Sequence, residues 1–423
     1  MSELVFPLSA PEATDAARFG PKAANLAALG QAGLPIPGGY GLDAEAYRVQ
    51  MRALGLADSA RQVFSTEGLE ARRHALDIKL GLLDQPVDES LAEPLLDAWR
   101  SMMGAPGTLG VVRSSALVED RFGSSFAGQF ESFLGLEDET EFLTAVRSCW
   151  CALWSTRALR YMATHDLDPA DTAMALIIQP LVHAKASGGG LSQTAEGEML
   201  ISATWGLGSA IAQGEVVPDR YVVSRDGVIR DVSAGRKSHA VGCVHGSRAV
   251  NRTRAEEPCL DSDQVLELAA MLKQSEDVVG GPAEIEWSLD ETGFKMLQAR
   301  PLHVEAPHVP DQIWEQHPRL KGHPAGVGWG TGRARIVNCE CELARVDPGD
   351  VLVTTVAGPA LSQVLPRVSA VVAELGGSTS HLASLARERG IPMVLGVLDA
   401  TYSIPDGSTV AVDGVAGIVR WMN

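Results

Sequence analysis

The stretch GGSTSHLASLARERGIPMVLG, residues 376–396, decides how the C-terminal part of this chain folds. The apolar run SAVVAE precedes it and PMVLG closes it, a pattern typical of a strand, a helix and a second strand. Ser378 and Ser380 are good N-cap residues, and Gly390 suits the position that ends a helix in the left-handed conformation. We therefore predict a helix over residues 380–389 with His381 in its first turn.

A histidine in the first turn of a helix is suited to hold an anion. Unpaired backbone N–H groups and the positive end of the helix dipole lie there. A neutral imidazole nitrogen is also a competent nucleophile near neutral pH. His381 is thus a candidate carrier of a phosphoryl group, although its position alone equally allows a capping or core histidine without chemistry.

The flanking sequence outlines the domains. Residues 303–323 collect prolines and histidines without sustained periodicity, which indicates a linker and a candidate hinge. Residues 324–423 read as a small domain, and residues 1–302 show a mixed α/β pattern, so we expect an α+β or α/β multidomain protein. The small domain has short β-rich runs at residues 333–337, 350–354, 369–374, 392–396 and 408–413.

Charge and composition exclude several classes of protein. The net charge of −18 disfavours nucleic acid or an anionic membrane as the main partner, because phosphate backbones need a basic surface. Six cysteines in 423 residues imply no disulfide framework, and we expect structural cysteines in a reducing compartment. The N-terminus lacks a secretory signal and no long apolar run occurs, so the sequence predicts a cytoplasmic protein.

A second informative stretch is PAEIEWSLDETGFKMLQARP, residues 282–301. Two alternating runs flank Glu291-Thr292-Gly293, which predicts a hairpin closed by a three-residue loop. One face of this hairpin would be polar and the other would belong to the core. The polar face carries Glu284, Glu286, Gln298 and Arg300; the core face carries Ile285, Trp287, Leu297 and Ala299.

The polar face of the hairpin suits a metal ion next to phosphate. Carboxylate and carboxamide oxygens, here from Glu284, Glu286 and Gln298, are the ligands that Mg²⁺ prefers. Arg300 offers bidentate contacts to phosphate. An exposed hairpin with cross-strand ion pairs is the alternative interpretation.

Two N-terminal stretches also suit phosphate. FGPKAANLAALG places Lys22 just inside a helix start, and VVRSSALVEDRFGSSFAGQF follows Arg113 with a Ser/Gly-rich loop through Gly128. Backbone amides of such a loop can cradle phosphates. The chain has no GxxxxGK[ST] motif, which excludes a P-loop.

Together these pieces resemble the phosphoenolpyruvate synthase and pyruvate phosphate dikinase family, which includes the rifampin phosphotransferases. The matching segments run nearly end to end and also include IIQPLV at 177–182, GEVVPDRYVV at 214–223 and VDGVAGIV near the C-terminus. The resemblance implies an N-terminal ATP-grasp domain and a swivelling phosphohistidine domain, joined by the linker. It also implies ATP and Mg²⁺ as cofactors and an ATP-dependent phosphotransferase reaction that releases AMP and phosphate.

The resemblance assigns roles to individual residues. The residues that would hold ATP phosphates or cover them are Lys22, Arg113, Gly128, Gln129 and Ser132. The segment from Gln179 to Val182 would contact adenine. Glu286 and Gln298 would bind Mg²⁺, with Glu284 beside them. Arg300 would bind phosphate, and His381 would be phosphorylated. Departures from the family pattern are Glu284 in place of aspartate, Ser209, Leu375, and the glycine-rich Ser187–Gly190 in place of SGV.

The acceptor of the phosphoryl group stays open. The chain stops about where the family's C-terminal barrel would start, and the linker is too short for a separate acceptor domain, so we expect neither a complete phosphoenolpyruvate synthase nor a complete rifampin phosphotransferase. A small molecule or an acceptor held by a partner subunit of a split, phenylphosphate-synthase-like complex would serve. A nucleotide-binding regulatory module and a carboxylate–amine ligase are alternatives.

Overall fold

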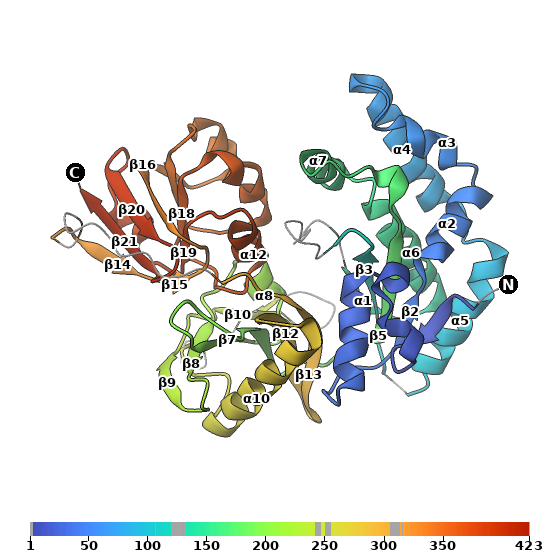
Figure 1. Cartoon of the computed structure of the whole chain (residues 1–423), viewed down its shortest axis with the longest axis horizontal. Coiled ribbons are helices and arrows are strands. Elements are labelled where there is room, and N and C mark those ends of the chain that lie inside the picture. The colour runs from blue at the N-terminus through green and yellow to red at the C-terminus, as the bar shows by residue number, and fades with distance from the viewer. Residues whose placement is uncertain are drawn as a thin grey trace. The chain divides into compact units, whose positions relative to one another are not determined.

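A computed structural model describes residues 3–105, 107–119, 130, 132–241, 247–249, 255–304, 314 and 316–422. The chain forms two compact units (Figure 1). One comprises Met1–Val182 and Lys295–Ala299, and the other comprises His183–Phe294 and Arg300–Asn423. Within the described residues, no helix has the length and apolar character needed to cross a membrane.

The first unit is built on a five-stranded antiparallel sheet in the order β1-β2-β5-β3-β4. Its strands are β1 Val5–Pro7, β2 Tyr40–Leu42, β3 Gly110–Ala116, β4 Ser132–Leu136 and β5 Met174–Pro180. Its helices are α1 Ala16–Gln31, α2 Ala44–Ala53, α3 Ala57–Gln62, α4 Gly68–Asp84, α5 Glu89–Met102, α6 Glu139–Ala152 and α7 Thr156–Thr164. Helices α1 and α6 both pack on β3 and β5.

Helix α1 bends where the sequence predicts a helix start. Gly20 has φ of 73°, and Pro21 follows it inside the helix. The Ser115 hydroxyl donates to Phe19 O and accepts from Ala23 N at 3.1 Å, so it satisfies backbone groups that the bend leaves unpaired. The bend places Lys22 in the first turn of the second helical segment.

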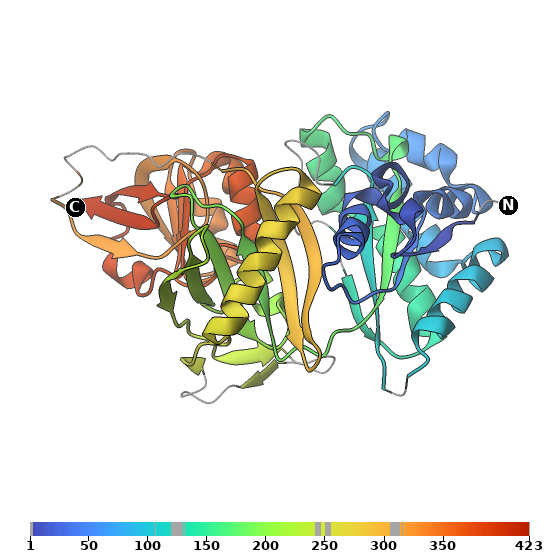
Figure 2. The same cartoon turned by 60° about the horizontal axis from the view of Figure 1, so that its bottom comes forward.

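The second unit contains a six-stranded sheet in the order β13-β12-β6-β7-β8-β9. Its strands are β6 Ala186–Leu191, β7 Met199–Trp205, β8 Asp219–Val223, β9 Ile229–Ser233, β12 Ala283–Asp290 and β13 Gly293–Pro301, whose residues 295–299 belong to the first unit. Helix α10, Ser262–Val279, lies along one face (Figure 2). Smaller elements are α8 Ser209–Ala212 and the paired strands β10 His239–Val241 and β11 Ser247–Ala249.

The hairpin of β12 and β13 follows the predicted alternation, with one difference at its turn. Ile285 and Trp287 are fully buried, as expected for a core face. Strand β13 begins at Gly293, so the loop has two residues instead of the predicted three. The Asp290 carboxylate accepts from the N–H of Thr292 at 2.6 Å and from its hydroxyl at 2.7 Å. These hydrogen bonds stabilise the shorter turn.

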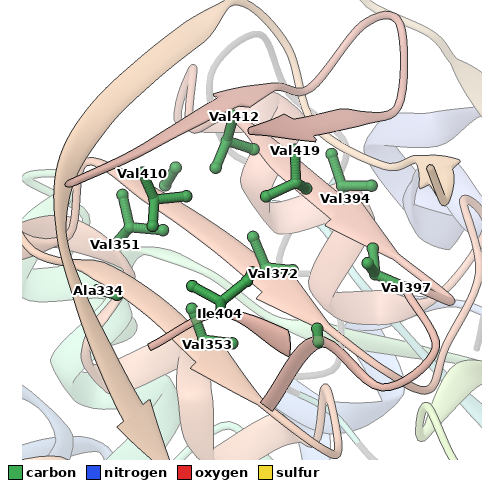
Figure 3. Close-up of a cluster of buried hydrophobic side chains, with 12 residues drawn as sticks. Ala334, Val351, Val353, Val372, Val394, Val397, Ile404, Val410, Val412 and Val419 are labelled. Carbon is green, nitrogen blue, oxygen red and sulfur yellow. The ribbon is translucent and has the colours of Figure 1, made fainter. Parts of the chain in front are cut away.

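The C-terminal part of the second unit is an eight-stranded sheet, in the order β14-β21-β20-β16-β17-β18-β19-β15. Its strands are β14 Arg319–Lys321, β15 His323–Pro324, β16 Trp329–Val337, β17 Val351–Thr354, β18 Ala370–Ala373, β19 Met393–Leu395, β20 Thr409–Asp413 and β21 Ile418–Met422, with helices α12 His381–Glu388 and α13 Ala400–Ser403. All five β-rich runs predicted here coincide with strands. Valines dominate the core (Figure 3), since the central parallel strands are buried.

Two regions differ from the sequence expectations. Strand β14 and the first residue of β15 lie inside the predicted linker and are paired in the sheet, while residues 305–313 and 315 lie outside the described part of the chain. Cys339 and Cys341 form a disulfide across one intervening residue, whereas the cysteine content of the sequence implied no disulfide framework. Cys149, Cys151 and Cys259 are buried and form no disulfide among the described residues, and Cys243 lies outside them.

Candidate functional site

His381 is the first residue of α12, as the sequence predicts. The Ser380 hydroxyl caps the helix by accepting from Ala383 N at 3.2 Å. The other proposed cap, Ser378, instead donates its hydroxyl to Pro324 O. Gly390, with φ of 66°, follows the last turn. The half-buried His381 therefore lies at a capped helix N-terminus, beside backbone N–H groups that have no partner within the helix.

The next turns of α12 contact the predicted polar face of the hairpin. The Ser384 hydroxyl donates to Glu284 Oε1 at 3.0 Å, and Arg387 Nη2 donates to Glu284 Oε2 at 2.9 Å. Arg300 Nη2 lies 3.1 Å from Glu284 Oε1 and donates to Ser384 Oγ. Residues more than 80 positions apart along the chain thus form one buried polar cluster around Glu284.

The polar cluster stabilises the ionised form of Glu284. Burial by itself would raise the pKa of the carboxyl group. The guanidinium groups of Arg300 and Arg387, together with their hydrogen bonds, outweigh burial and lower the pKa to about 2. Glu284 is therefore a carboxylate at neutral pH, neutralised by two arginines.

The loop that leads into α12 lies against strand β6 and the segment before β8. Gly376 N donates to Val216 O at 3.0 Å. A Cβ atom added at Gly377 would lie 2.5 Å from Pro218 Cγ, and one added at Gly189 would lie 2.6 Å from Thr379 Cβ. The two glycines before the helix thus allow the loop to pack closely against these segments.

In the first unit, Lys22 is paired with a residue that the sequence interpretation missed. Lys22 Nζ lies 3.0 Å from Glu119 Oε1, and the Glu119 side chain is fully buried. Glu119 also accepts from Ala116 N at 3.2 Å, which fixes the carboxylate beside the end of β3. The signal for it was an acidic residue within the same Val111–Phe130 motif that supplies Arg113.

Arg113 and Gln298 also come together in the first unit. Arg113 donates to Leu297 O at 2.6 Å and to Gln298 Oε1 at 3.0 Å. The amide oxygen that was expected to bind a metal ion is thus already an acceptor for a guanidinium.

The other proposed ATP contacts are dispersed along the sheet. Gln179, buried in β5, donates its side-chain amide to Gly38 O at 3.0 Å, and the half-buried Val182 ends the unit. Ser132 is the exposed first residue of β4. Gly128 and Gln129 lie outside the described residues.

The proposed magnesium ligands have different surroundings. Glu286 is half-buried and lies on the same face of β12 as Glu284, two residues away. Both oxygens of Glu284 are engaged by arginines or Ser384, so a cation there would compete with two guanidinium groups. Among the residues that the structure describes, no group of three or more His, Cys, Asp or Glu side chains is arranged to hold a metal ion. Glu286 and Gln298 offer oxygen donors that fit Mg²⁺ chemically, although a cation at Gln298 would replace the hydrogen bond from Arg113, and Glu284 fits it less well.

Known proteins resemble this chain over nearly its whole length. Phosphoenolpyruvate synthase of Pyrococcus furiosus is 31% identical over 96% of this chain and 57% of its own length. The enzyme of the same name from Aeropyrum pernix is 31% identical over 95% of this chain and 56% of its own. That of Escherichia coli is 28% identical over 95% and 55%. The chain therefore spans a little over half the length of these relatives.

Two family models match in succession. The model of the pyruvate phosphate dikinase AMP/ATP-binding domain matches residues 16–319, which carry Lys22, Arg113, Glu284 and Arg300. The model of the mobile domain of PEP-utilising enzymes matches residues 346–417, which carry His381. The chain belongs to the pyruvate phosphate dikinase family, with the AMP/ATP-binding domain followed by the mobile domain.

Proposed function

We propose that this chain is an ATP-dependent phosphotransferase of the dikinase type, with His381 as the residue that carries the phosphoryl group. A ring nitrogen of His381 attacks the β-phosphorus of ATP, and the bond to the α,β-bridging oxygen breaks, so that AMP leaves with that oxygen. Water then releases the γ-phosphoryl group as phosphate. The remaining phosphohistidine passes its phosphoryl group to an acceptor.

The observation that supports this proposal most directly is the contact between Arg300 and Ser384. It brings the arginine expected to grip phosphate to the helix turn that follows His381. Anionic oxygens near His381 would then meet a guanidinium and the N-terminal N–H groups of α12 together. Both features stabilise the negative charge of a phosphoryl group during transfer.

The remaining residues have supporting roles in this proposal. Lys22 and Arg113 would bind ATP phosphates as cations. Glu286 and Gln298 would hold Mg²⁺, which neutralises charge on the phosphate oxygens when bound. The acidic net charge of the chain makes such local cations important, because an anionic nucleotide is otherwise repelled.

The first prediction concerns the half-reaction without any acceptor. Incubation with ATP and Mg²⁺ should add phosphoryl mass to the intact protein and release AMP, because histidine accepts the group before the acceptor is needed. Intact-protein mass spectrometry and nucleotide chromatography measure both products. His381→Ala should abolish the added mass, whereas His183→Ala, which changes an exposed histidine of the same unit, should leave it unchanged.

Two outcomes would contradict this proposal. ADP without modified protein would indicate a ligase or a simple kinase, and acid-labile label that persists in His381→Ala would place the phosphoryl group elsewhere. If the half-reaction occurs, candidate acceptors can be tested on the phosphorylated protein. Self-phosphorylation without turnover of any small molecule would favour an acceptor site on a partner chain.

A further inference from the structure

The face of the six-stranded sheet that carries Glu284 and Glu286 is closely matched to the helix of His381. Gly189 of β6 pairs with Glu286 of β12, so the two residues share this face. Thr379, two residues before His381, lies directly over Gly189. The three atoms nearest to a Cβ placed at Gly189 all belong to Thr379, at 2.6–2.9 Å. The approach of the loop therefore depends on the absence of a side chain at Gly189.

The charged part of this face is equally specific. Glu284 and Arg387 are each 8% exposed at the side chain and lie 2.9 Å apart. A buried carboxylate needs a complete set of partners, and Glu284 obtains it from its own hairpin through Arg300 and from α12 through Ser384 and Arg387. The hairpin and the helix thus provide hydrogen-bond partners for each other's buried polar side chains.

Arg387 also forms hydrogen bonds with backbone carbonyls near its own helix. It donates to Ser378 O at 2.6 Å and to Ala325 O at 3.3 Å, so two backbone carbonyls orient its guanidinium in addition to Glu284. Ser378 belongs to the loop that leads into the helix. Recognition of Glu284 by Arg387 is therefore tied to the conformation of the loop that precedes His381.

We propose that Gly189 and Glu284 form a docking surface that recognises Thr379, Ser384 and Arg387 and thereby positions His381 for phosphoryl uptake. The inference rests on the proposed function, and it assigns Glu284 to docking in preference to metal binding. Gly189, Glu284, Ser384 and Arg387 are positioning residues, because they act through the placement of His381 and need not touch the nucleotide.

The steric half of the docking surface is tested by Gly189→Val. Valine suits a β-strand, and the crowding it creates is with Thr379, so the change should block docking while leaving strand β6 intact. We expect phosphohistidine formation at saturating ATP and Mg²⁺ to slow at least tenfold, with the KM for ATP unchanged within twofold. The control Gly281→Val adds the same side chain where no atom lies within 4 Å of the new Cβ.

The charged half is tested by a double-mutant cycle of Glu284→Gln and Ser384→Ala. Because the two side chains bond each other, the double variant should be hardly slower than the worse single variant. Ser384→Thr keeps the hydroxyl and should restore most of the rate. Ser408→Ala is the matched control, since that buried hydroxyl bonds only Pro405 O among the described residues.

Hydrogen exchange measures docking without any chemistry. Amides of α12 should lose at least tenfold protection in Gly189→Val and in Glu284→Gln, while amides of β17 and β18 keep theirs. If the wild type forms no phosphohistidine, the proposed function fails but exchange still decides whether docking occurs. Wild-type rates and protection in both variants would overturn the docking surface. A faster rate in Gly189→Val would mean that the docked helix is a resting state, which also overturns the proposal.

Discussion

At the scale of single residues, His323 is a histidine whose ring is held neutral. Its Nδ1 is buried and has no hydrogen-bond partner among the described residues, although the residue as a whole is half-buried. Burial, and to a smaller extent the positive charge of Arg220, lower the pKa to about 4 against a smaller opposing effect of Asp219. The ring lies against Gly396, where an added Cβ would approach Cδ2 to 2.8 Å. Protonation therefore places an unsolvated charge in a tightly packed position.

This environment predicts a pH dependence of stability. The unfolded chain binds a proton at His323 near pH 6.5 and the folded chain only near pH 4, so the unfolded state holds more protons between these values. Titration of His323 does not change the free energy of unfolding above pH 6.5. As the pH falls from 6.5 to 4, it lowers this free energy progressively. His323→Asn should reduce the loss of Tm between pH 7 and pH 5. An equal pH dependence of Tm in wild type and His323→Asn would contradict the assignment.

Glu284 illustrates where inference from the sequence ends at this scale. Its alternation with Ile285 and Trp287 correctly predicted that it lies on the polar face of the hairpin. The partners that engage it, Ser384 and Arg387, are 100 and 103 residues away. Local periodicity carries no information about such contacts. The same limit applies to Lys22 and Glu119, which are 97 residues apart.

At the scale of elements, predictions succeeded where local signals agree. The cap at Ser380 and the terminating Gly390 place the ends of α12 within one residue of the predicted range. The five C-terminal strands were found from short β-branched runs between turns. Three strands of the sheet, β14, β15 and β21, were not predicted. β14 and β15 are short and rich in charged residues, histidine and proline, and only pairing with β21 and β19 makes them strands.

The bend in α1 provides a prediction at this scale. Gly20 has a positive φ, and a Cβ added there would lie 2.4 Å from Ser115 O and 2.5 Å from Ser115 Oγ. Gly20→Ala therefore combines backbone strain with displacement of the serine that supports the second helical segment. We expect it to destabilise the first unit by about 3 kcal/mol or more, whereas Gly33→Ala, also at positive φ but in open space, should cost about 1 kcal/mol.

Urea unfolding monitored in the first unit would measure both variants. Equal losses for Gly20→Ala and Gly33→Ala would show that backbone strain alone matters and that the contact with Ser115 is unimportant. A larger loss for Gly20→Ala, accompanied by weaker ATP binding, would connect the bend to the placement of Lys22.

At the scale of the whole molecule, the compact units and the sequence families divide the chain differently. The AMP/ATP-binding model covers residues 16–319 and therefore parts of both units. The chain passes between the units at Val182–His183, Phe294–Lys295 and Ala299–Arg300. The predicted boundary at residue 302 lies within the range that the AMP/ATP-binding model matches. Compactness instead groups the six-stranded sheet with the mobile domain, through contacts such as that of Glu284 with Arg387. The order of the family motifs can be read from the sequence. Which of the segments pack most closely together in the fold cannot.

Lys22 and His381 belong to different units, so we predict that ATP binding and phosphoryl transfer can be lost separately. ATP binding stabilises the folded state by mass action, about 2.7 kcal/mol at a ligand concentration one hundred times Kd. Lys22→Met alone would remove the cation that neutralises the buried Glu119 carboxylate, so the informative pair is Glu119→Gln and the double variant Glu119→Gln/Lys22→Met. We expect ATP and Mg²⁺ to raise the Tm of wild type, Glu119→Gln and His381→Ala by several degrees, and that of the double variant by much less. Because each shift compares one variant with and without ATP, differences in basal stability cancel. Loss of the shift in His381→Ala would mean that the histidine itself contributes to nucleotide binding, and a full shift in the double variant would exclude Lys22 from the ATP site.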